Sequence, residues 1–316
     1  MNNWKIRPFQ IKTDLDQTAE LIELSFDPFL DTEGHIYLQR LRDTCLKWKK
    51  FPFTFYLSHS NMIPAGIVCE TTDQRIIGHI SLFPITVSGE NAFLIANVCV
   101  HPDFRRNHIA EDMMKAALNI SVQTSAKALY LQTRREVPES TEMYLKLGFS
   151  EDTRRTEWKL PFENRKSANE GAFFFSKSSI SEKKTFDFNF AHFYPASIYW
   201  NLNYDPHLFL PGWKGFIRNQ LSGRQNSFDK IVDPNGRILC WTVWQEMSGS
   251  TDSVWFIPNG DISDEEAEIC LVMIGDRYEM TKQIQINTQQ NFLTSSFQAA
   301  GYQIQSQLIW MSKRIN

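Results

Sequence analysis

Residues 98–110 read VCVHPDFRRNHIA, and this stretch decides the fold of the 316-residue chain. An apolar strand ends at His101, and a helix begins near Ile109, directly after a turn that carries Arg105 and Arg106. A helix N-terminus presents unpaired backbone N–H groups and the positive end of the helix dipole, which together attract anions. The stretch therefore predicts an anion site, for which phosphate or pyrophosphate is the natural ligand.

The helix after this turn is indicated by its apolar spacing. Ile109, Met113, Ala117 and Ile120 recur at intervals of three or four residues and form one apolar stripe. Asp103 precedes the turn and is a candidate N-cap.

Length and composition limit the classes of protein that the chain can represent. Its length favours two domains, and 22% charged with 42% hydrophobic residues is an ordinary globular balance. The net charge is −3 and neither half is basic, so nucleic acid is not an expected partner. The chain has no apolar run of membrane-spanning length and no signal-peptide pattern at its start. We therefore expect no membrane association and a cytoplasmic location.

The cysteines predict neither disulfides nor a metal site. They are odd in number and widely spaced, and they form no CxxC pair or ligand cluster: Cys45, Cys69, Cys99, Cys240 and Cys270. We expect reduced thiols with a structural role and no bound metal.

The pattern of the first 160 residues alternates strands and helices. Strands are expected at 4–12, 65–70, 75–85, 92–100, 128–133 and 149–160, and helices at 13–25, 35–48, 109–122 and 138–147. Thr13 or Asp14 is the expected cap of the first helix. The order predicts an α/β (α+β) class with a mixed, mostly antiparallel central sheet flanked by helices.

The second half reads as a repeat of the first. Arg75 to Ile77 matches Arg237 to Leu239, Val98 to Pro102 matches Val254 to Pro258, and Tyr144 and Gly148 match Phe297 and Gly301. The three matches follow in the same order at similar offsets, which favours a second copy of one fold. A polar stretch separates the copies, so we expect domains at 1–162 and 185–316 with a linker at 163–184. Aromatic residues are dense at 186–216, where packing between the domains is favoured over a substrate pocket.

Two motifs about 35 residues apart carry a family resemblance: VxVHPxxRxxHIA at 98–110 and YLKLGF at 144–149. Together they resemble the GCN5-related N-acetyltransferase (GNAT) superfamily. The resemblance covers residues 4–160 well and the second half as a degenerate copy, so the chain looks like a tandem of two GNAT-like domains. It implies acetyl-CoA as the co-substrate.

The resemblance also implies residue roles. A bulge in the strand would free main-chain groups at Val98, Cys99 and Val100 for the pantetheine arm and for the oxyanion of the reaction. The pyrophosphate would be held by backbone amides of the following loop: Arg105, Arg106, Asn107, His108, Ile109 and Ala110. Tyr144 occupies the position of a general acid that protonates the departing thiolate, with packing in the helix core as the alternative.

The sequence departs from the family pattern in three places. His108 stands where the family usually has Gly, and it would adopt a helical conformation with a looser fit or add its own hydrogen bond to phosphate. Val137 stands where Asn is often found. In the second copy the turn 259–266 contains no Arg, and Ser263 and Glu266 are expected to form a capping box. We therefore predict that only the first half binds acetyl-CoA.

The leading functional hypothesis is transfer of an acetyl group from acetyl-CoA to a primary amine, by direct attack in a ternary complex. Alternatives are a non-catalytic module that binds or senses acyl-CoA and, with less support, an aminoacyl transferase. The acceptor, a small molecule or a peptide, is not identified by the sequence. Glu70, His79 and His101 are candidates for the general base, and none is chosen. A homodimer is left open.

Overall fold

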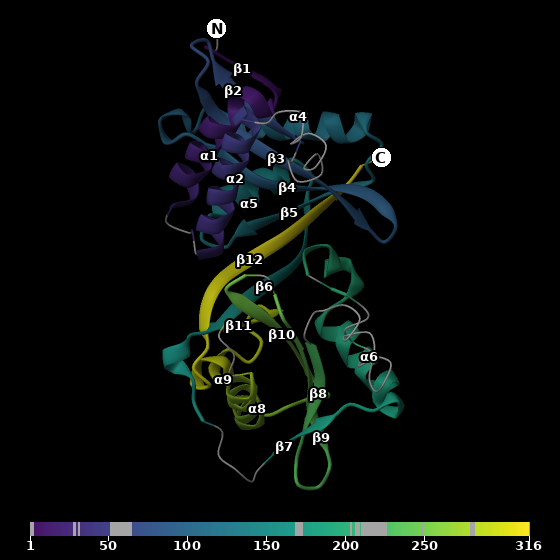
Figure 1. Cartoon of the computed structure of the whole chain (residues 1–316). Helices are drawn as coiled ribbons and strands as arrows, with labels where there is room; N and C mark the ends of the chain where they lie inside the picture. The colour runs from purple at the N-terminus through teal and green to yellow at the C-terminus, as the bar shows by residue number, and fades with distance from the viewer. Residues whose placement is uncertain are drawn as a thin grey trace. The chain divides into compact units, whose positions relative to one another are not determined.

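The computed structural model describes residues 3–27, 30, 32–50, 65–167, 173–202, 204–205, 209, 226–247, 249–278 and 282–315. The chain divides into two compact units (Figure 1). The first consists of Met1–Thr133, Val137–Glu151 and Trp310–Asn316, and the second of Arg134–Glu136 and Asp152–Ile309.

The first unit contains a mixed sheet flanked by helices. Its elements are β1 (Trp4–Pro8), α1 (Ile11–Phe26), α2 (Thr32–Lys50), β2 (Ala65–Thr71), β3 (Ile76–Val87), β4 (Glu90–Val100), α4 (Ile109–Gln123), β5 (Ala128–Arg134) and α5 (Pro138–Lys146). The strand order is β1-β2-β3-β4-β5, followed by the end of β12 (Gln303–Arg314). Neighbours from β1 to β4 are antiparallel and the pair β4–β5 is parallel. The predicted fold class is confirmed.

The second unit contains the corresponding elements. They are β6 (Ser150–Leu160), β7 (Phe174–Lys177), α6 (Lys183–Phe193), β8 (Asn226–Val232), β9 (Ile238–Gln245), β10 (Thr251–Pro258), α8 (Asp264–Arg277), β11 (Gln283–Gln289), α9 (Thr294–Ala299) and the beginning of β12. The strand order is β7-β8-β9-β10-β11-β6-β12. Here the pair β10–β11 is the parallel one.

The expected repeat is present in the backbone hydrogen bonds. The amide of Phe149 donates to Tyr144 O at 3.0 Å, as the amide of Tyr302 donates to Phe297 O at 2.9 Å. The first and third sequence matches therefore hold, but the second is displaced. His101 donates to Ile77 O at 2.8 Å and Asn259 to Leu239 O at 2.9 Å. His101 is thus equivalent to Asn259. The sequence match of Val98–Pro102 with Val254–Pro258 pairs His101 with Ile257 instead, two residues earlier.

The last strand of each copy is exchanged. β5 lies next to β12, which ends the second copy, whereas β11 lies next to β6, which ends the first copy. Each of these two strands contributes residues to both units. The sequence does not indicate this exchange, because β6 and β12 resemble the strands that stay within one copy in their length and in their pattern of residues.

The start of the first helix differs from the expectation. β1 ends at Pro8 and α1 begins at Ile11, so Thr13 and Asp14 lie inside the helix and neither is the N-cap. Asp14 still satisfies a free amide, since its carboxylate accepts from Gln10 N at 2.7 Å. The same carboxylate accepts from the Arg7 guanidinium at 2.6 Å, which ties the helix start to β1.

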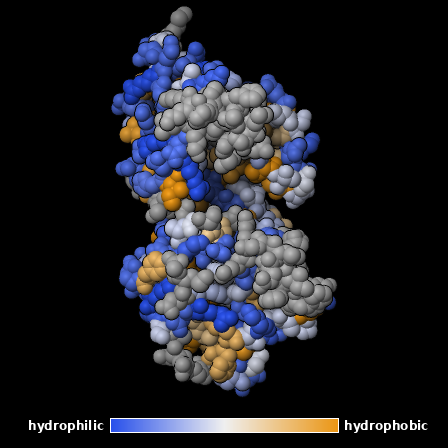
Figure 2. Space-filling model, viewed as in Figure 1, coloured by the Kyte–Doolittle hydropathy of each residue, from blue (hydrophilic) through white to orange (hydrophobic). Residues whose placement is uncertain are grey.

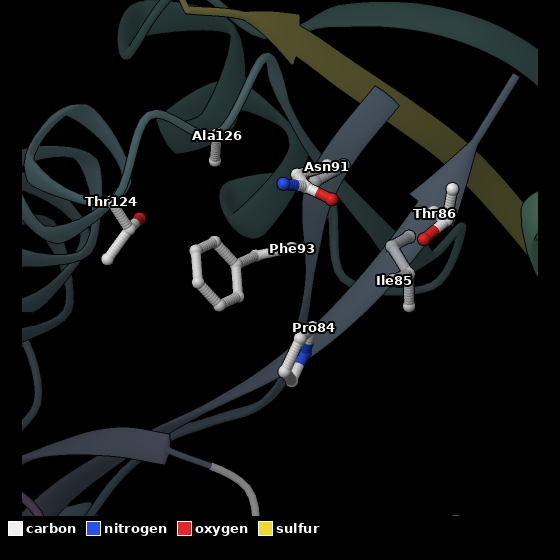
Figure 3. A pocket seen from close by; sticks show the side chains of 8 residues that line it. Pro84, Ile85, Thr86, Asn91, Phe93, Thr124 and Ala126 are labelled. Carbon is white, nitrogen blue, oxygen red and sulfur yellow. The ribbon is translucent and has the colours of Figure 1, made fainter. Parts of the chain in front are cut away.

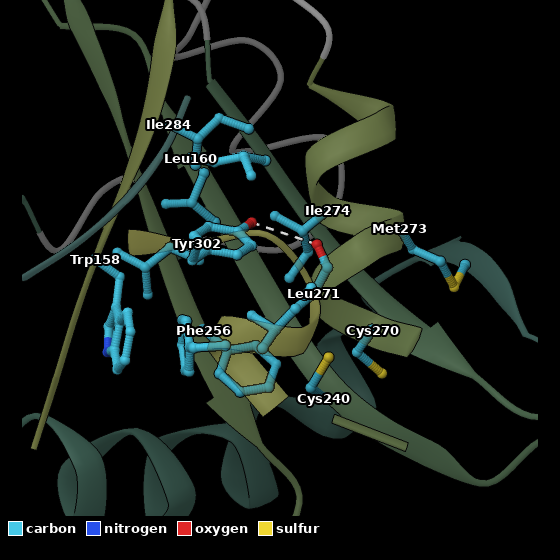
Figure 4. Close-up of a cluster of buried hydrophobic side chains, with 14 of the residues drawn as sticks. Trp158, Leu160, Cys240, Phe256, Cys270, Leu271, Met273, Ile274, Ile284 and Tyr302 are labelled. Atoms are coloured by element: carbon cyan, nitrogen blue, oxygen red, sulfur yellow. Dashed lines mark hydrogen bonds between the residues drawn. The ribbon is translucent and has the colours of Figure 1, made fainter. Parts of the chain in front are cut away.

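The aromatic residues after position 185 form a core inside the second unit, which corrects the expectation of packing between domains. Members of this cluster are Phe186, Phe190, Tyr194, Phe209, Trp241, Val243, Trp255 and Ile257. Residues 203, 206–208 and 210–216 of the aromatic stretch lie outside the described part. A second cluster lies against α8 (Figure 4), where the Tyr302 hydroxyl donates to Leu271 O at 3.3 Å. Cys240 and Cys270 in this cluster, with Cys69 and Cys99 in the first unit, are buried free thiols.

In the coloured part of Figure 2, hydrophilic side chains predominate, and apolar side chains appear in separate groups. Within the described ranges, no helix is long and apolar enough to cross a membrane.

Candidate functional site

The strands β4 and β5 separate part of the way along their length. They pair in parallel from Ala92 with Ala128 to Ile95 with Leu131, and no later pair joins them in the described part of the chain. Both strands nevertheless continue, β4 to Val100 and β5 to Arg134. The main chain after Ile95 therefore has an open edge on the side of β5.

A bulge lies at this point of separation. On β3 the register advances by two residues from His79 to Ser81, whereas on β4 it advances by three from Cys99 to Ala96. The extra residue is accommodated at Asn97, which has a left-handed φ of 52°. The bulge that the family resemblance implies is present.

The direction of the main-chain groups follows from strand alternation. The amide of His101 donates to Ile77 O on β3, so the N–H and C=O of Cys99 also face β3 and those of Val100 face the opposite side. The same alternation directs the main chain of Val98 to the open edge. The side chain of Cys99 is buried, with Sγ 3.9 Å from His79 O. Val98 and Val100 therefore present main-chain groups to the open edge, and Cys99 does not.

The loop between β4 and α4 forms a concave set of amides. Arg106 and His108 both have left-handed φ values, 63° and 58°. Within the described residues, no backbone carbonyl accepts from the amides of Arg106, Asn107 or His108, and the first amide bound to the helix is that of Asp112, to His108 O. Successive free amides around left-handed residues make a nest that binds anions. The amides of Ile109 and Ala110 extend it as the free first turn of α4.

Side chains of the loop fix its shape. The Asn107 amide donates to Phe104 O at 3.1 Å and to Arg105 O at 3.2 Å. Arg105 Nε donates to Val100 O at 3.2 Å, which links the loop to the open edge. Arg106 is exposed. Two guanidinium groups thus lie beside the nest.

Two expectations for this loop are corrected. Asp103 does not cap α4, because a short 3-10 turn (Pro102–Phe104) intervenes and the N-cap is His108. His108 is not helical but left-handed, a conformation that Gly adopts without a steric penalty, which explains why Gly suits this position. The imidazole is exposed, and its Nδ1 lies 3.3 Å from Glu111 Oε2.

Tyr144 lies on the buried side of α5. Its side chain is buried and contacts the Phe149 ring edge-to-face, with 5.9 Å between the ring centres. Burial raises the pKa of the phenol above its ordinary value, so the group is protonated at neutral pH. Gly148 ends the helix with a left-handed φ of 83°, and Lys313 donates to Leu147 O at the same helix end. Val137 is the N-cap of α5 and makes no side-chain capping bond.

The three candidate bases have different environments. Glu70 accepts a 2.9 Å hydrogen bond from Arg7 and pairs with Lys5, and the Arg7 bond lowers its pKa to about 2. His79 is buried, which lowers its pKa to about 4, and its Nε2 lies 2.8 Å from Ser81 Oγ. His101 Nε2 lies 2.7 Å from Arg75 Nη2. Glu70 is therefore held as a structural carboxylate.

The second unit lacks these features at the equivalent place. β9 and β10 pair without a register shift from Ser253 to Pro258, so no bulge is present there. Ser263 and Glu266 form the predicted capping box, and Glu266 also pairs with Arg237. The helix start is satisfied by its own carboxylates, which repel an anion.

Tyr194 occupies the gap between the separating strands of the second unit. β10 and β11 pair only as far as Val254 with Ile286. Beyond that pair, the Tyr194 hydroxyl donates to Asn287 O on β11 at 2.8 Å and lies 3.4 Å from Phe256 O on β10. The sequence did not indicate this role, because Tyr194 is one of many aromatic residues in its stretch.

Arg155 also bonds to groups at this gap. Its guanidinium donates to Asn287 Oδ1 at 2.7 Å and to Phe193 O at 3.0 Å, and it lies 5.2 Å from the centre of the Tyr194 ring. The side chain is buried, which lowers its pKa to about 10. Main-chain groups that are open in the first unit are thus bound to side chains in the second.

A separate pocket of about 370 Å³ lies at the far end of β3 and β4 (Figure 3). The Phe93 ring points into it, and the lining includes Pro84, Asn91 and Thr124. None of the predicted site residues lines it. Among the residues that the structure describes, no group of three or more His, Cys, Asp or Glu side chains is placed to hold a metal ion.

Comparisons with known proteins agree with this geometry. Residues 19–149 match the model of the acetyltransferase (GNAT) family. A GCN5-related N-acetyltransferase from Sphaerobacter thermophilus superposes with a TM-score of 0.57 at 10% identity, over 99% of this chain and 96% of that one. A tandem GNAT protein from the clavulanic acid biosynthesis pathway gives 0.53 at 11% identity, over 98% of both chains. No curated protein matches the sequence.

These similarities fit the two units that the structure contains. The family match ends at Phe149, at the junction of α5 with β6, and it includes the bulge, the nest and Tyr144. Both superposed structures extend over almost the whole chain, so they share the repeat as well as the first unit. Residues 19–149 thus match the acetyltransferase (GNAT) family model, and the chain as a whole has a fold similar to that of tandem GNAT proteins.

Proposed function

We propose that the first unit binds acetyl-CoA and transfers its acetyl group to a primary amine. Proteins of this family transfer acyl groups from acyl-CoA. The observation that carries the finer assignment is the line of main-chain groups that runs from the Asn97 bulge, along Val98 and the amide of Val100, to the nest at Arg106 and His108. An acyl group, an extended amide-containing arm and a pyrophosphate occur in this order in acetyl-CoA.

The loop supplies the binding of the phosphates. Backbone amides from Arg106 to Ala110 would surround the pyrophosphate, and the Arg105 and Arg106 guanidinium groups would add charge. Val98 and Val100 would pair with the pantetheine arm through their main chain. Cys99 has its main chain directed to β3, so its contribution is to hold its two neighbours in place.

The reaction needs one proton acceptor and one proton donor. The amine nitrogen attacks the acetyl carbonyl carbon, and the carbon–sulfur bond then breaks as the oxyanion collapses. The amine loses a proton and the thiolate gains one, and Tyr144 is the proposed donor because burial keeps its phenol protonated. A main-chain amide at the bulge would stabilise the oxyanion.

One acetyl-CoA molecule is proposed per chain. The Tyr194 hydroxyl bonds to the Phe256 carbonyl of the second unit, at the position that Val98 occupies in the first, and Tyr194 and Arg155 both bond to the carbonyl of Asn287. The acidic helix start at Ser263 disfavours phosphate independently.

Calorimetric titration of the full chain with acetyl-CoA tests the proposal. We expect a stoichiometry of one, and release of thiol when a panel of primary amines is added that includes spermidine, glucosamine and a lysine peptide. Arg106→Ala should weaken binding, whereas Lys146→Ala, an exposed cation outside the loop, should not. A wild-type protein that does not bind acetyl-CoA would refute the proposal.

A module that binds acyl-CoA without catalysis is the second candidate. It is favoured by His108, whose left-handed backbone carries a side chain at the mouth of the nest. Binding with a stoichiometry of one and no thiol release with any amine in the panel would support this second function instead.

A further inference from the structure

The bulge residue Asn97 is held by side chains from two other elements. Its Nδ2 donates to the Tyr37 hydroxyl on α2 at 3.0 Å and to Ser81 Oγ on β3 at 3.0 Å. Ser81 is in turn within 2.8 Å of His79 Nε2. His79 and Ser81 are buried. These four residues form a polar network around the bulge and inside an apolar sheet.

The network fits the conformation of Asn97. A left-handed backbone is unfavourable for residues other than Gly, although Asn tolerates it better than most. Such a conformation persists where several independent contacts of the surrounding structure hold it in place. The Asn97 side chain has two N–H donors, and each finds a hydroxyl on a different element. The position of the bulge is therefore fixed relative to both β3 and α2.

The second unit supplies an internal comparison. His101 is equivalent to Asn259 through the bonds to Ile77 and Leu239, so His79 and Ser81 correspond to Trp241 and Val243. Both of these are buried apolar residues, and the neighbouring strand β10 has no bulge. The polar network and the bulge are therefore present together in one copy and absent together in the described part of the other.

Within the proposed function, we infer that Asn97 is a positioning residue, held by Tyr37 and Ser81, that sets the bulge amide to recognise the acetyl carbonyl of acetyl-CoA. It makes the site selective for the acetylated cofactor over free CoA. The remainder of the cofactor is bound by the open edge and the nest, which Asn97 does not touch. The network therefore affects the acetyl group and leaves the affinity for CoA itself unchanged.

This separation gives a readout that a general structural role would not produce. Loss of packing at the bulge would weaken binding of CoA and acetyl-CoA together. Loss of the positioning alone would weaken the binding of acetyl-CoA and leave the binding of CoA unchanged. The dissociation constant of CoA divided by that of acetyl-CoA would then fall toward one.

The test is calorimetric titration of the full chain with acetyl-CoA and, separately, with CoA. Tyr37→Phe and Ser81→Ala each remove one acceptor of the Asn97 amide, and Asn97→Gly removes both bonds while it retains access to the left-handed backbone. We expect acetyl-CoA to bind ~3–10-fold more weakly in each variant, in keeping with the loss of one hydrogen bond, and CoA to bind within about twofold of wild type. Ser121→Ala and Tyr302→Phe, at buried hydroxyls outside the network, are the matched controls.

Two results would overturn the inference. One is an equal loss of affinity for both ligands in all three variants, and the other is an unchanged affinity for both ligands. A wild-type protein that binds neither ligand would refute the proposed function first, and it is recognised before any variant is measured. Tyr37→Phe retains the ring and its packing, so a failure of Asn97→Gly to fold leaves the comparison intact.

Discussion

The Tyr194 hydroxyl donates to the main-chain carbonyl of Asn287 at 2.8 Å, in the gap where the two parallel strands of the second unit separate. By the alignment of His101 with Asn259, the nearby Phe256 is the equivalent of Val98 in the first unit. In the second unit a side chain thus bonds to the main chain at this gap, whereas in the first unit the main chain of Val98 is open at the same place. This relationship supports the proposal that one fold, present twice, binds the cofactor in its first copy alone.

Tyr194→Phe should destabilise the second unit without affecting the cofactor site. The change removes the hydroxyl that bonds to the Phe256 carbonyl and leaves the Asn287 carbonyl with Arg155 as its side-chain donor, which costs about 1–3 kcal/mol. Denaturant unfolding should show this loss in free energy of unfolding, and titration should show unchanged affinity for acetyl-CoA. Tyr204→Phe is the control, because Tyr204 packs against the same aromatic cluster and is only partly buried. A changed affinity for acetyl-CoA would mean that the second unit takes part in binding.

Arg106→Ala should lower the affinity for acetyl-CoA by about 3–10-fold, because an exposed guanidinium beside the nest contributes a partly screened attraction to phosphate. The difference between variant and wild type should shrink as the salt concentration rises. Arg105→Ala should have a larger effect, since Arg105 also bonds to Val100 O. Titrations at low and high salt measure both effects. A loss that is independent of salt would argue against a direct charge contribution.

His108→Gly distinguishes the two roles that the sequence left open for His108. A Gly at a φ of 58° removes the strain and the Cβ, so binding of acetyl-CoA should become several-fold tighter. His108→Ala removes the same imidazole but keeps the Cβ and the strained backbone, and it should bind no better than wild type. If the imidazole itself bonded to phosphate, both variants would bind more weakly.

Much of the first unit could be predicted from sequence because its periodic pattern and its motifs coincide. The boundaries of α4, β5 and α5 lie within one residue of the predicted ones. The exchange of β6 and β12 could not be predicted, because strand pairing between distant segments leaves no local trace. Asn97 could have been noticed as a polar residue in the apolar run FLIANVCV, but its partner Tyr37 is 60 residues away.

Tyr144→Phe should lower the turnover of acetyl transfer and leave the dissociation constant for acetyl-CoA unchanged, because the phenol is proposed to act only when the thiolate leaves. Burial raises the pKa of Tyr144, so its proton should be retained throughout the range from neutral pH to about 10. Wild-type turnover should therefore show no decline from ionisation of this phenol in that range. Thiol release with the best amine of the panel, measured against pH, tests both statements. Unchanged turnover in the variant would assign Tyr144 to packing.

The ion pair between Arg7 and Glu70 should make the first unit sensitive to acid. The hydrogen bond from Arg7 lowers the pKa of Glu70 to about 2, below its ordinary value of 4.5. Because the folded value is the lower one, the pair contributes its full stability above pH 4.5, and this contribution is lost as the pH falls toward 2. Glu70→Gln should therefore lower the melting temperature at neutral pH, and the difference from wild type should narrow steadily below pH 4.5. Thermal unfolding of both proteins across this range measures the difference. A gap of constant size would contradict the assignment of the shift to the ionised pair, and Glu139→Gln, at an exposed carboxylate on α5, is the control.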